Sequence, residues 1–391
     1  MEKIDEIVAN GIIMVSAIGN DGPLYGTLNN PADQLDVIGV GGIDYRDKIA
    51  SFSSRGMSTH ELPHGYGRVK PDIVAYGRDV MGSKIAGGCR SLSVSSHPQS
   101  PFREYQMPNY QPITDRSSPH PPQGTSVASP VVAGAVTLLA SVVPRERRWE
   151  ILNPGVMKQA LVEGADVIAG GPMIYEQGAG KLNLHASREI LRDYTPRASL
   201  VPGSLDFTKC PYMWPHCRQA VYHGAMPFMF NATIVNGMGL TGWLESPPVW
   251  KPSGGDMSAS NGDVAAPGGD LGAHVDVRFE FSDVLWPYSG YLAFYARVKP
   301  SAKKSEGIAS GTITFTVLSP PGPGETELRR STVNVPVKFQ VIPTPPRAKR
   351  VLWSQYHSVR YPPGYIPRDN LEAKNDILVR PVSFTYPNTQ L

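Results

Sequence analysis

The sequence predicts two folded units in series, an α/β unit built on a parallel sheet and then an antiparallel β-sandwich-like domain. The α/β unit is predicted by short, continuously apolar runs at 11–18, 35–43 and 71–77. Such runs are typical of strands that are covered on both faces of a parallel sheet. The second unit is predicted by alternating, β-branched runs between Pro and Gly turns, as in 274–282 and 311–319.

Length and composition agree with this division. With 391 residues, of which 41% are hydrophobic, the chain is long enough to bury more than one core. The 39 Gly and 38 Pro residues favour turns and β structure over long helical bundles. We expect the α/β unit to cover 1–195 and the β-rich domain to cover 196–343. Because 342–350 is rich in Pro, 344–391 is expected to hold a linker and the truncated start of a further region.

Three helices are expected in the first unit, at 126–141, 154–165 and 183–193. Asn153 followed by Pro154 is typical of a helix start, since Asn caps the first turn and Pro needs no hydrogen-bond partner at the first helical position. The first of these helices is rich in Ala, Gly and Ser, which allow close packing against a sheet.

Charge and hydropathy exclude several partners. The net charge is +3, and no basic block stands out that would indicate a nucleic-acid partner. No run reaches the roughly 18 apolar residues that a membrane span needs. The charged start of the sequence also differs from a secretory signal peptide. We therefore expect no nucleic-acid partner, and neither a membrane span nor a signal peptide in this sequence.

Ser126 is a candidate nucleophile because it lies in a Gly-Thr-Ser segment at the start of an expected helix. Free backbone N–H groups and the positive end of the helix dipole can hold a developing oxyanion there. Gly124 allows close approach of the backbone. The alternative is that Gly-Thr-Ser simply caps a core helix, which is an ordinary arrangement.

Asn20 is a candidate oxyanion donor because it follows an apolar strand, in the sequence Gly-Asn-Asp-Gly. An amide held at a strand end can donate a hydrogen bond to a carbonyl oxygen as negative charge forms on it. The alternative is an Asx turn, which the sequence Asn-Asp-Gly strongly favours.

Taken in order, four stretches resemble the subtilisin-like serine proteases. The resemblance implies a subtilisin-like parallel sheet, of which this chain holds the C-terminal half, with Ser126 as nucleophile and Asn20 as oxyanion-hole donor. It also makes calcium a possible cofactor. The four stretches are SAIGNDG (16–22), FSSRG (52–56), KPDIVAYG (70–77) and GTSVASPVVAGAVTLL (124–139).

Further stretches resemble one branch of that family, which cleaves membrane-anchored transcription factor precursors. The branch implies protein substrates with Arg-x-hydrophobic-x sites, and a place in the lumen of the endoplasmic reticulum and Golgi for the full-length family member. The stretches are KCPYMWPHC (209–217), VLWPYSGYLA (284–293) and IPTPPRAKRVLWSQYH (342–357).

The sequence departs from the family at the other two catalytic positions. The family places its Asp and His before the Asn of the oxyanion hole, whereas no Asp-Ser-Gly, Asp-Thr-Gly or His-Gly-Thr occurs anywhere in this sequence. His60 and His64 follow Asn20 and do not match the motif. We expect the catalytic Asp and His to be absent from this chain and the chain alone to be inactive. The alternative is a non-catalytic isoform that acts as a binding or decoy module through its β domain.

A second departure precedes Gly124. Seven prolines occur in 94–123, with scattered Ser and Gln, where the family runs almost directly into Gly-Thr-Ser. This composition is typical of a disordered loop. We interpret the segment as a splice product or annotation error that damages the site.

Cysteine spacing and one tripeptide agree with the secretory compartment. Cys210 and Cys217 are close enough to form a local disulfide, which leaves Cys89 unpaired; a reduced pair in a cytosolic loop is the alternative. Asn231 begins Asn-Ala-Thr, an acceptor for glycosylation if the chain enters the secretory pathway.

Overall fold

The computed structural model describes most of both predicted units. Several predictions fall outside the residues it describes: the Pro-rich segment 94–123, His60, His64, the Cys210–Cys217 pair and the C-terminal region from 347 onward. The described residues are 2–58, 68–78, 80–84, 88–91, 124–170, 174–208, 221–225, 227–253 and 269–346.

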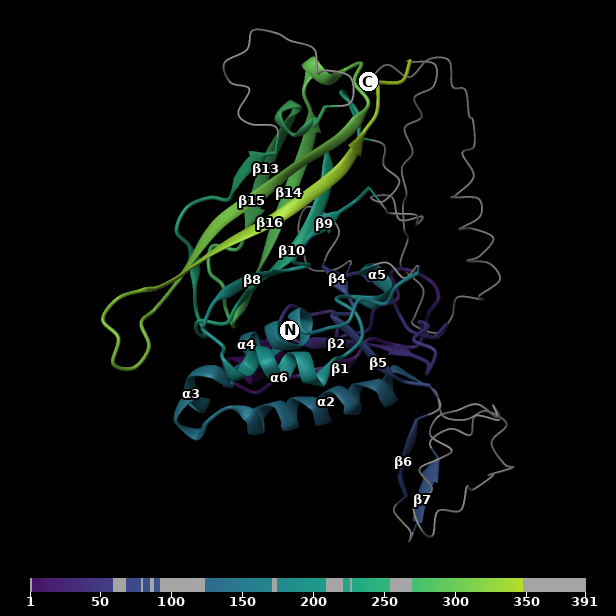
Figure 1. The fold of residues 1–391 in the computed structure, drawn as a ribbon, viewed down its shortest axis with the longest axis vertical. Helices are drawn as coiled ribbons and strands as arrows, with labels where there is room; N and C mark the ends of the chain where they lie inside the picture. Colours follow the sequence, from purple (N-terminus) through teal and green to yellow (C-terminus); the bar gives the residue numbers. More distant parts are fainter. Residues whose placement is uncertain are drawn as a thin grey trace.

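The first unit is built on a parallel three-stranded sheet, in the order β1-β2-β5 (Figure 1). Each strand lies within one of the apolar runs that predicted it, and β2 is buried along its whole length. Two short antiparallel hairpins accompany the sheet. The strands are β1 Val15–Ala17, β2 Ile38–Ile43, β3 Gly56–Met57, β4 Val69–Lys70, β5 Ile73–Tyr76, β6 Met81–Lys84 and β7 Gly88–Ser91.

The three expected helices are present as α2, α4 and α6, and their starts follow from local chemistry. Asn153 accepts a hydrogen bond from the N–H of Val156 at 2.9 Å, and Asn183 accepts one from the N–H of Ala186 at 2.9 Å. Both asparagines therefore satisfy a backbone donor that has no partner within the helix. The helices are α1 Glu2–Ala9, α2 Thr125–Val142, α3 Arg148–Ile151, α4 Pro154–Glu163, α5 Ile174–Gln177 and α6 Leu184–Arg192, with a 3₁₀ turn at Arg145–Arg147.

Helix α2 is apolar on both faces. Its inner face packs against the sheet through buried residues that include Ala128, Val132 and Leu139. On its outer face Val131 is 36% exposed and Leu138 is 58% exposed, and the helix carries no charged residue. Among the helices that the structure describes, α2 is the one long and apolar enough to cross a membrane by length and composition. Its packing against the sheet is that of a core helix.

A buried charge cluster joins Lys70 of β4 and Asp72, just before β5, to Lys158 of α4. The carboxylate of Asp72 accepts from Lys70 Nζ at 2.6 Å and contacts Lys158 Nζ at 3.0 Å, and all three side chains are buried. Burial lowers the pKa of Lys70 to about 7. Burial opposes ionisation of Asp72 as well, but the two lysines keep its pKa below the ordinary value. The KPD part of the KPDIVAYG stretch thus fastens the sheet to α4.

The second unit consists of two sheets. One is antiparallel, in the order β13-β14-β10-β8, and the other has the order β11-β15-β16-β9 with β12 paired to β15. The second sheet is mixed rather than purely antiparallel, because β9 runs parallel to β16. The strands are β8 Ala198–Val201, β9 Leu205–Asp206, β10 Phe228–Asn236, β11 Trp243–Leu244, β12 Val249–Pro252, β13 Val275–Phe281, β14 Ser289–Val298, β15 Gly307–Ser319 and β16 Arg329–Val341, with 3₁₀ turns at Gly272–His274 and Pro300–Ala302.

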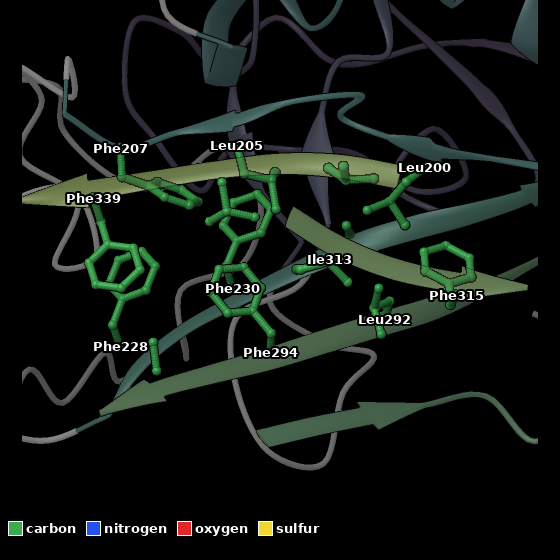
Figure 2. Packing of buried hydrophobic residues seen from close by; sticks show 14 of the residues in the cluster. Leu200, Leu205, Phe207, Phe228, Phe230, Leu292, Phe294, Ile313, Phe315 and Phe339 are labelled. Atoms are coloured by element: carbon green, nitrogen blue, oxygen red, sulfur yellow. The ribbon is translucent and has the colours of Figure 1, made fainter. Parts of the chain in front are cut away.

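One hydrophobic cluster fills the space between these two sheets (Figure 2). Within it the Phe207 ring centroid lies 4.8 Å from those of both Phe228 and Phe230 in edge-on geometry. Phe294 and Phe339 join the same cluster from β14 and β16. Alternate residues of each strand supply the apolar side chains, as the alternation in the sequence predicts.

Buried and half-buried polar contacts hold the two units together. The side-chain amide of Gln159 in α4 donates to the carbonyl oxygens of Arg197 and Val235, at 3.0 and 3.1 Å. Arg329 in β16 pairs with Glu150 of α3 at 2.9 Å. Because each contact joins elements far apart in the sequence, the second unit is fixed against the first.

Asp36 makes one of these contacts, and its replacement by asparagine is expected to stabilise the chain at neutral pH. The Ser289 hydroxyl donates to Asp36 Oδ1. Burial raises the pKa of Asp36 from 3.8 to about 6, although Ser289, Lys158 and Arg68 favour the charged form. The folded state therefore binds the proton more tightly than the unfolded state, so stability falls as the pH rises from about 4 to 6 and stays reduced above that.

Asp36→Asn should keep the hydrogen bond from Ser289 and remove this cost. We expect it to gain about 1 kcal/mol at pH 7.5, less than the whole shift implies because the side chain is only partly buried and water screens it. The gain should vanish at pH 4. Urea unfolding at both pH values measures it, with Asp193→Asn as an exposed control. A gain independent of pH would contradict the assignment.

Candidate active site

The turn after β1 presents Asn20. Gly19 has a φ of +115°, and a Cβ atom there would lie 2.6 Å from Asn29 Nδ2 and 2.7 Å from Ser54 Oγ. Only glycine combines this backbone conformation with so little space. The Asn20 side chain is exposed at the end of the turn.

Thr125, the first residue of α2, ties the helix to this turn. Its N–H donates to Asn20 Oδ1 at 2.8 Å, and its hydroxyl Oγ1 accepts from the N–H of Gly19 at 3.2 Å. The same oxygen lies 3.1 Å from Gly19 O and 3.1 Å from Asn20 Oδ1, and donates its proton toward them. Because the oxygen of the Asn20 amide is engaged by an N–H group, its Nδ2 is the end left to donate elsewhere.

Ser126 follows on the exposed side of the first turn of α2. A Cβ atom on Gly124 would lie 2.8 Å from Ser126 Oγ and 3.0 Å from Asn20 Nδ2. The hydroxyl and the amide therefore face one small space, and the absent side chain of Gly124 leaves that space open. The positive end of the α2 dipole points at the same space.

This arrangement is suited to acyl transfer. A hydroxyl can attack a carbonyl carbon placed beside it, and an amide N–H together with the helix N-terminus can hold the resulting oxyanion. The structure thus brings Ser126 and Asn20 together, although 105 residues separate Asn20 from the neighbouring Thr125. Sequence reasoning missed Thr125, whose place inside the Gly-Thr-Ser segment was the available signal.

The histidines in the described part of the chain are His185, His223 and His274. His185 lies on α6 of the first unit, while His223 and His274 lie in the second unit and bond Val298 O at 3.0 Å and Ser301 Oγ at 2.9 Å. Within the described ranges no hydrogen bond joins Ser126 to a histidine. The absence of a catalytic Asp and His from the chain stays a prediction.

The glycosylation site expected at Asn231 is disfavoured by its surroundings. Asn231 lies inside β10, opposite Ala293 of β14, and only 3% of it is exposed. A glycan needs an asparagine side chain that reaches solvent, so the folded domain has no room for one here. The tripeptide is a local pattern, whereas burial is decided by the sheet around it.

The structure gives little information on the predicted disulfide and on calcium. Cys89 lies in β7, while Cys210 and Cys217 are outside the described residues. Among the residues that are described, no group of three or more His, Cys, Asp or Glu could hold a metal ion. We therefore assign no residues to calcium.

Comparison with known proteins identifies the class. Residues 1–186 match the subtilase family, so the first unit belongs to that family of peptidases. Residues 201–344 match the third Ig-like domain of MBTPS1, and residues 345–380 match its fourth, GATase-like domain.

Among the subtilases, the chain is similar to site-1 proteases. It is 53% identical over 97% of its length to membrane-bound transcription factor site-1 protease of Rattus norvegicus, and 56% identical over 97% to subtilisin-like protease SBT6.1 of Arabidopsis thaliana. The chain spans 32% of the length of each. The self-cleaved protease domain of PatA is 25% identical, with a TM-score of 0.33, and the match covers 49% of this chain and 54% of that one.

Proposed function

We propose that this chain supplies the nucleophile-bearing part of a serine endopeptidase of the subtilisin type. The observation that carries the proposal is the position of Ser126 Oγ and Asn20 Nδ2, both within 3.0 Å of a single point at the start of α2. Membership of the subtilase family and the similarity to site-1 proteases support it.

The proposed reaction begins when Ser126 Oγ attacks the scissile carbonyl carbon and its proton passes to a base. The carbonyl oxygen becomes an oxyanion that accepts hydrogen bonds from Asn20 Nδ2 and the N-terminus of α2. The C–N bond then breaks, and the leaving amine takes the proton from the protonated base. Water attacks the acyl-enzyme by the reverse proton path and regenerates the serine hydroxyl.

We further propose that the base and the Asp that orients it belong to a polypeptide segment that docks beside α2. Helix α2 lies at the outside of the first unit (Figure 1). Its outer face exposes Val131 and Leu138, and the helix carries no charged residue. A helix that faced only water would carry charged residues on this side. Among the described strands of the first unit, β1 is an edge strand that pairs only with β2, and an edge strand can accept an added strand.

The substrates of the complete enzyme are proposed to be membrane-anchored transcription factor precursors, cleaved at Arg-x-hydrophobic-x sites in the endoplasmic reticulum or Golgi lumen. The name of the rat relative, membrane-bound transcription factor site-1 protease, supports this class. The second candidate, a non-catalytic module that binds through the Ig-like unit, is favoured by one observation: one hydrophobic cluster fills that unit, and from the first unit it takes in the buried residues Val69 and Tyr175.

A fusion that supplies the missing base should distinguish the peptidase from the non-catalytic binding module. We expect the 391-residue chain alone to hydrolyse no Arg-x-Leu-Leu peptide above background, because an unactivated hydroxyl is a poor nucleophile. A fusion that places the preceding region of the rat relative ahead of Met1 should gain turnover when residues 94–123 are deleted. The same fusion with 94–123 retained, matched in folding by circular dichroism, tests that segment. A folded fusion without turnover in either form would favour the binding module.

A further inference from the structure

The loop between β2 and β3 supports the turn that holds Asn20. Ser54, fully buried in this loop, donates its N–H to Gly19 O at 3.0 Å. Its hydroxyl Oγ accepts the N–H of Asp21 at 3.1 Å. Ser54 therefore forms hydrogen bonds with the backbone of both neighbours of Asn20.

The loop between β2 and β3 is in turn fixed by Arg55. Arg55, which is buried, donates through Nε to Ser53 O at 3.1 Å and through Nη2 to Ala50 O at 3.1 Å. Its remaining nitrogen forms an ion pair with Glu176 of α5. A guanidinium that engages two carbonyl oxygens and a carboxylate is a rigid anchor, because its donors lie in one plane. Ser54 is thus attached to a fixed frame.

Asn20 needs this support because its own side chain is exposed. The bond from the N–H of Thr125 sets the rotation of the Asn20 amide, but the position of the Asn20 backbone depends on its two neighbours. A displacement of about 1 Å in a catalytic group can cost about 10² in rate. Loss of either hydrogen bond of Ser54 would let the peptide units on each side of Asn20 move.

We propose that Ser54 is a positioning residue that holds Asn20 where it can donate to the oxyanion. This inference rests on the proposed function for its kinetic consequence, and on the hydrogen bonds alone for its structural one. The FSSRG segment then supports the turn at residues 19–21, called the catalytic turn below. The chain of contacts runs from Glu176 to Arg55, and from its neighbour Ser54 to the backbone on both sides of Asn20.

Ser53 offers a matched control one residue away. It is also fully buried, and its hydroxyl also accepts a backbone N–H, but from Gly42 of β2 at 3.0 Å and not from the catalytic turn. Ser53→Ala and Ser54→Ala each remove one buried hydroxyl from the same loop. A purely structural role predicts similar effects from both, whereas a positioning role predicts a kinetic effect from Ser54→Ala only.

The kinetic test uses the fusion from which residues 94–123 are deleted, called the active fusion below. We expect Ser54→Ala to lower kcat about 10-fold to 10²-fold with KM changed less than about 3-fold, and Ser53→Ala to leave kcat within about 3-fold. Added to Asn20→Ala, which removes the donor and should cost about 10²–10³, Ser54→Ala should cost little more. Equal losses from the two serine variants, or additive losses with Asn20→Ala, would overturn the proposal.

A second readout needs no activity. In the ¹⁵N-labelled 391-residue chain, Ser54→Ala should accelerate hydrogen exchange of the Asp21 amide and shift the Asn20 side-chain amide resonances. Ser53→Ala should do neither. If the fusion has no turnover, these spectra still decide the positioning role: unchanged Asn20 and Asp21 signals in Ser54→Ala would refute it.

Discussion

Replacement of Ser126 by alanine is expected to lower kcat of the active fusion by about 10⁶-fold, the scale measured for loss of the nucleophile in subtilisin. The loss is large because the covalent step has no substitute, while the oxyanion donors and substrate binding remain. Turnover of an Arg-x-Leu-Leu peptide, measured at saturating substrate, gives the value.

The fold should be unaffected, because Ser126 is exposed at the start of α2. Equal thermal unfolding of the Ser126→Ala and parent fusions is therefore the control. Turnover that survives in the variant at more than about one thousandth of the parent rate would show that another group performs the attack, and the assignment of Ser126 would be wrong.

Gly124→Ala is expected to lower kcat by at least about 10²-fold in a chain that still folds. The added Cβ would occupy the space that Ser126 Oγ and Asn20 Nδ2 share, at 2.8 and 3.0 Å from them. The oxyanion and the new methyl group cannot both fit there, and displacing either catalytic group by about 1 Å costs about 10². Since the φ of Gly124 is 169°, an extended conformation open to any residue, backbone strain plays no part.

Gly134→Ala is the matched control in the same helix. A Cβ atom at Gly134 would meet nothing within 4 Å, and alanine in a helix interior stabilises by roughly 0.5–1 kcal/mol relative to glycine. In the 391-residue chain, without the added region, Gly134→Ala should raise the thermal unfolding temperature slightly. If Gly124→Ala retained full kcat, the space between Ser126 and Asn20 would not be where the carbonyl oxygen binds.

Local patterns were sufficient for the elements of the site. The apolar run ending in Gly-Asn-Asp-Gly predicted a strand followed by a turn, and the small residues after Gly-Thr-Ser predicted α2, because hydrophobic periodicity and turn chemistry act over a few residues. Asn153 predicted the start of α4 for the same reason. The family resemblance then named Ser126 and Asn20 as partners.

Long-range packing decided the rest. The bond from Thr125 to Asn20 joins residues 105 apart, and the grip of Ser54 on the catalytic turn crosses 33 residues. Neither spacing has a local signature, because both contacts exist only after the loops have packed around the sheet. The parallel pairing of β9 with β16 arises in the same way.

Asn231 illustrates the difference most directly. Its tripeptide is complete in the sequence, yet Asn231 is buried in the folded chain, inside β10 and opposite Ala293 of β14. The sequence alone named Ser126 and Asn20 as candidate site residues and located the strands β1, β2 and β5 and the helices α2, α4 and α6. The tertiary structure alone decided which of them meet and which reach solvent, since burial depends on strand pairing between distant segments.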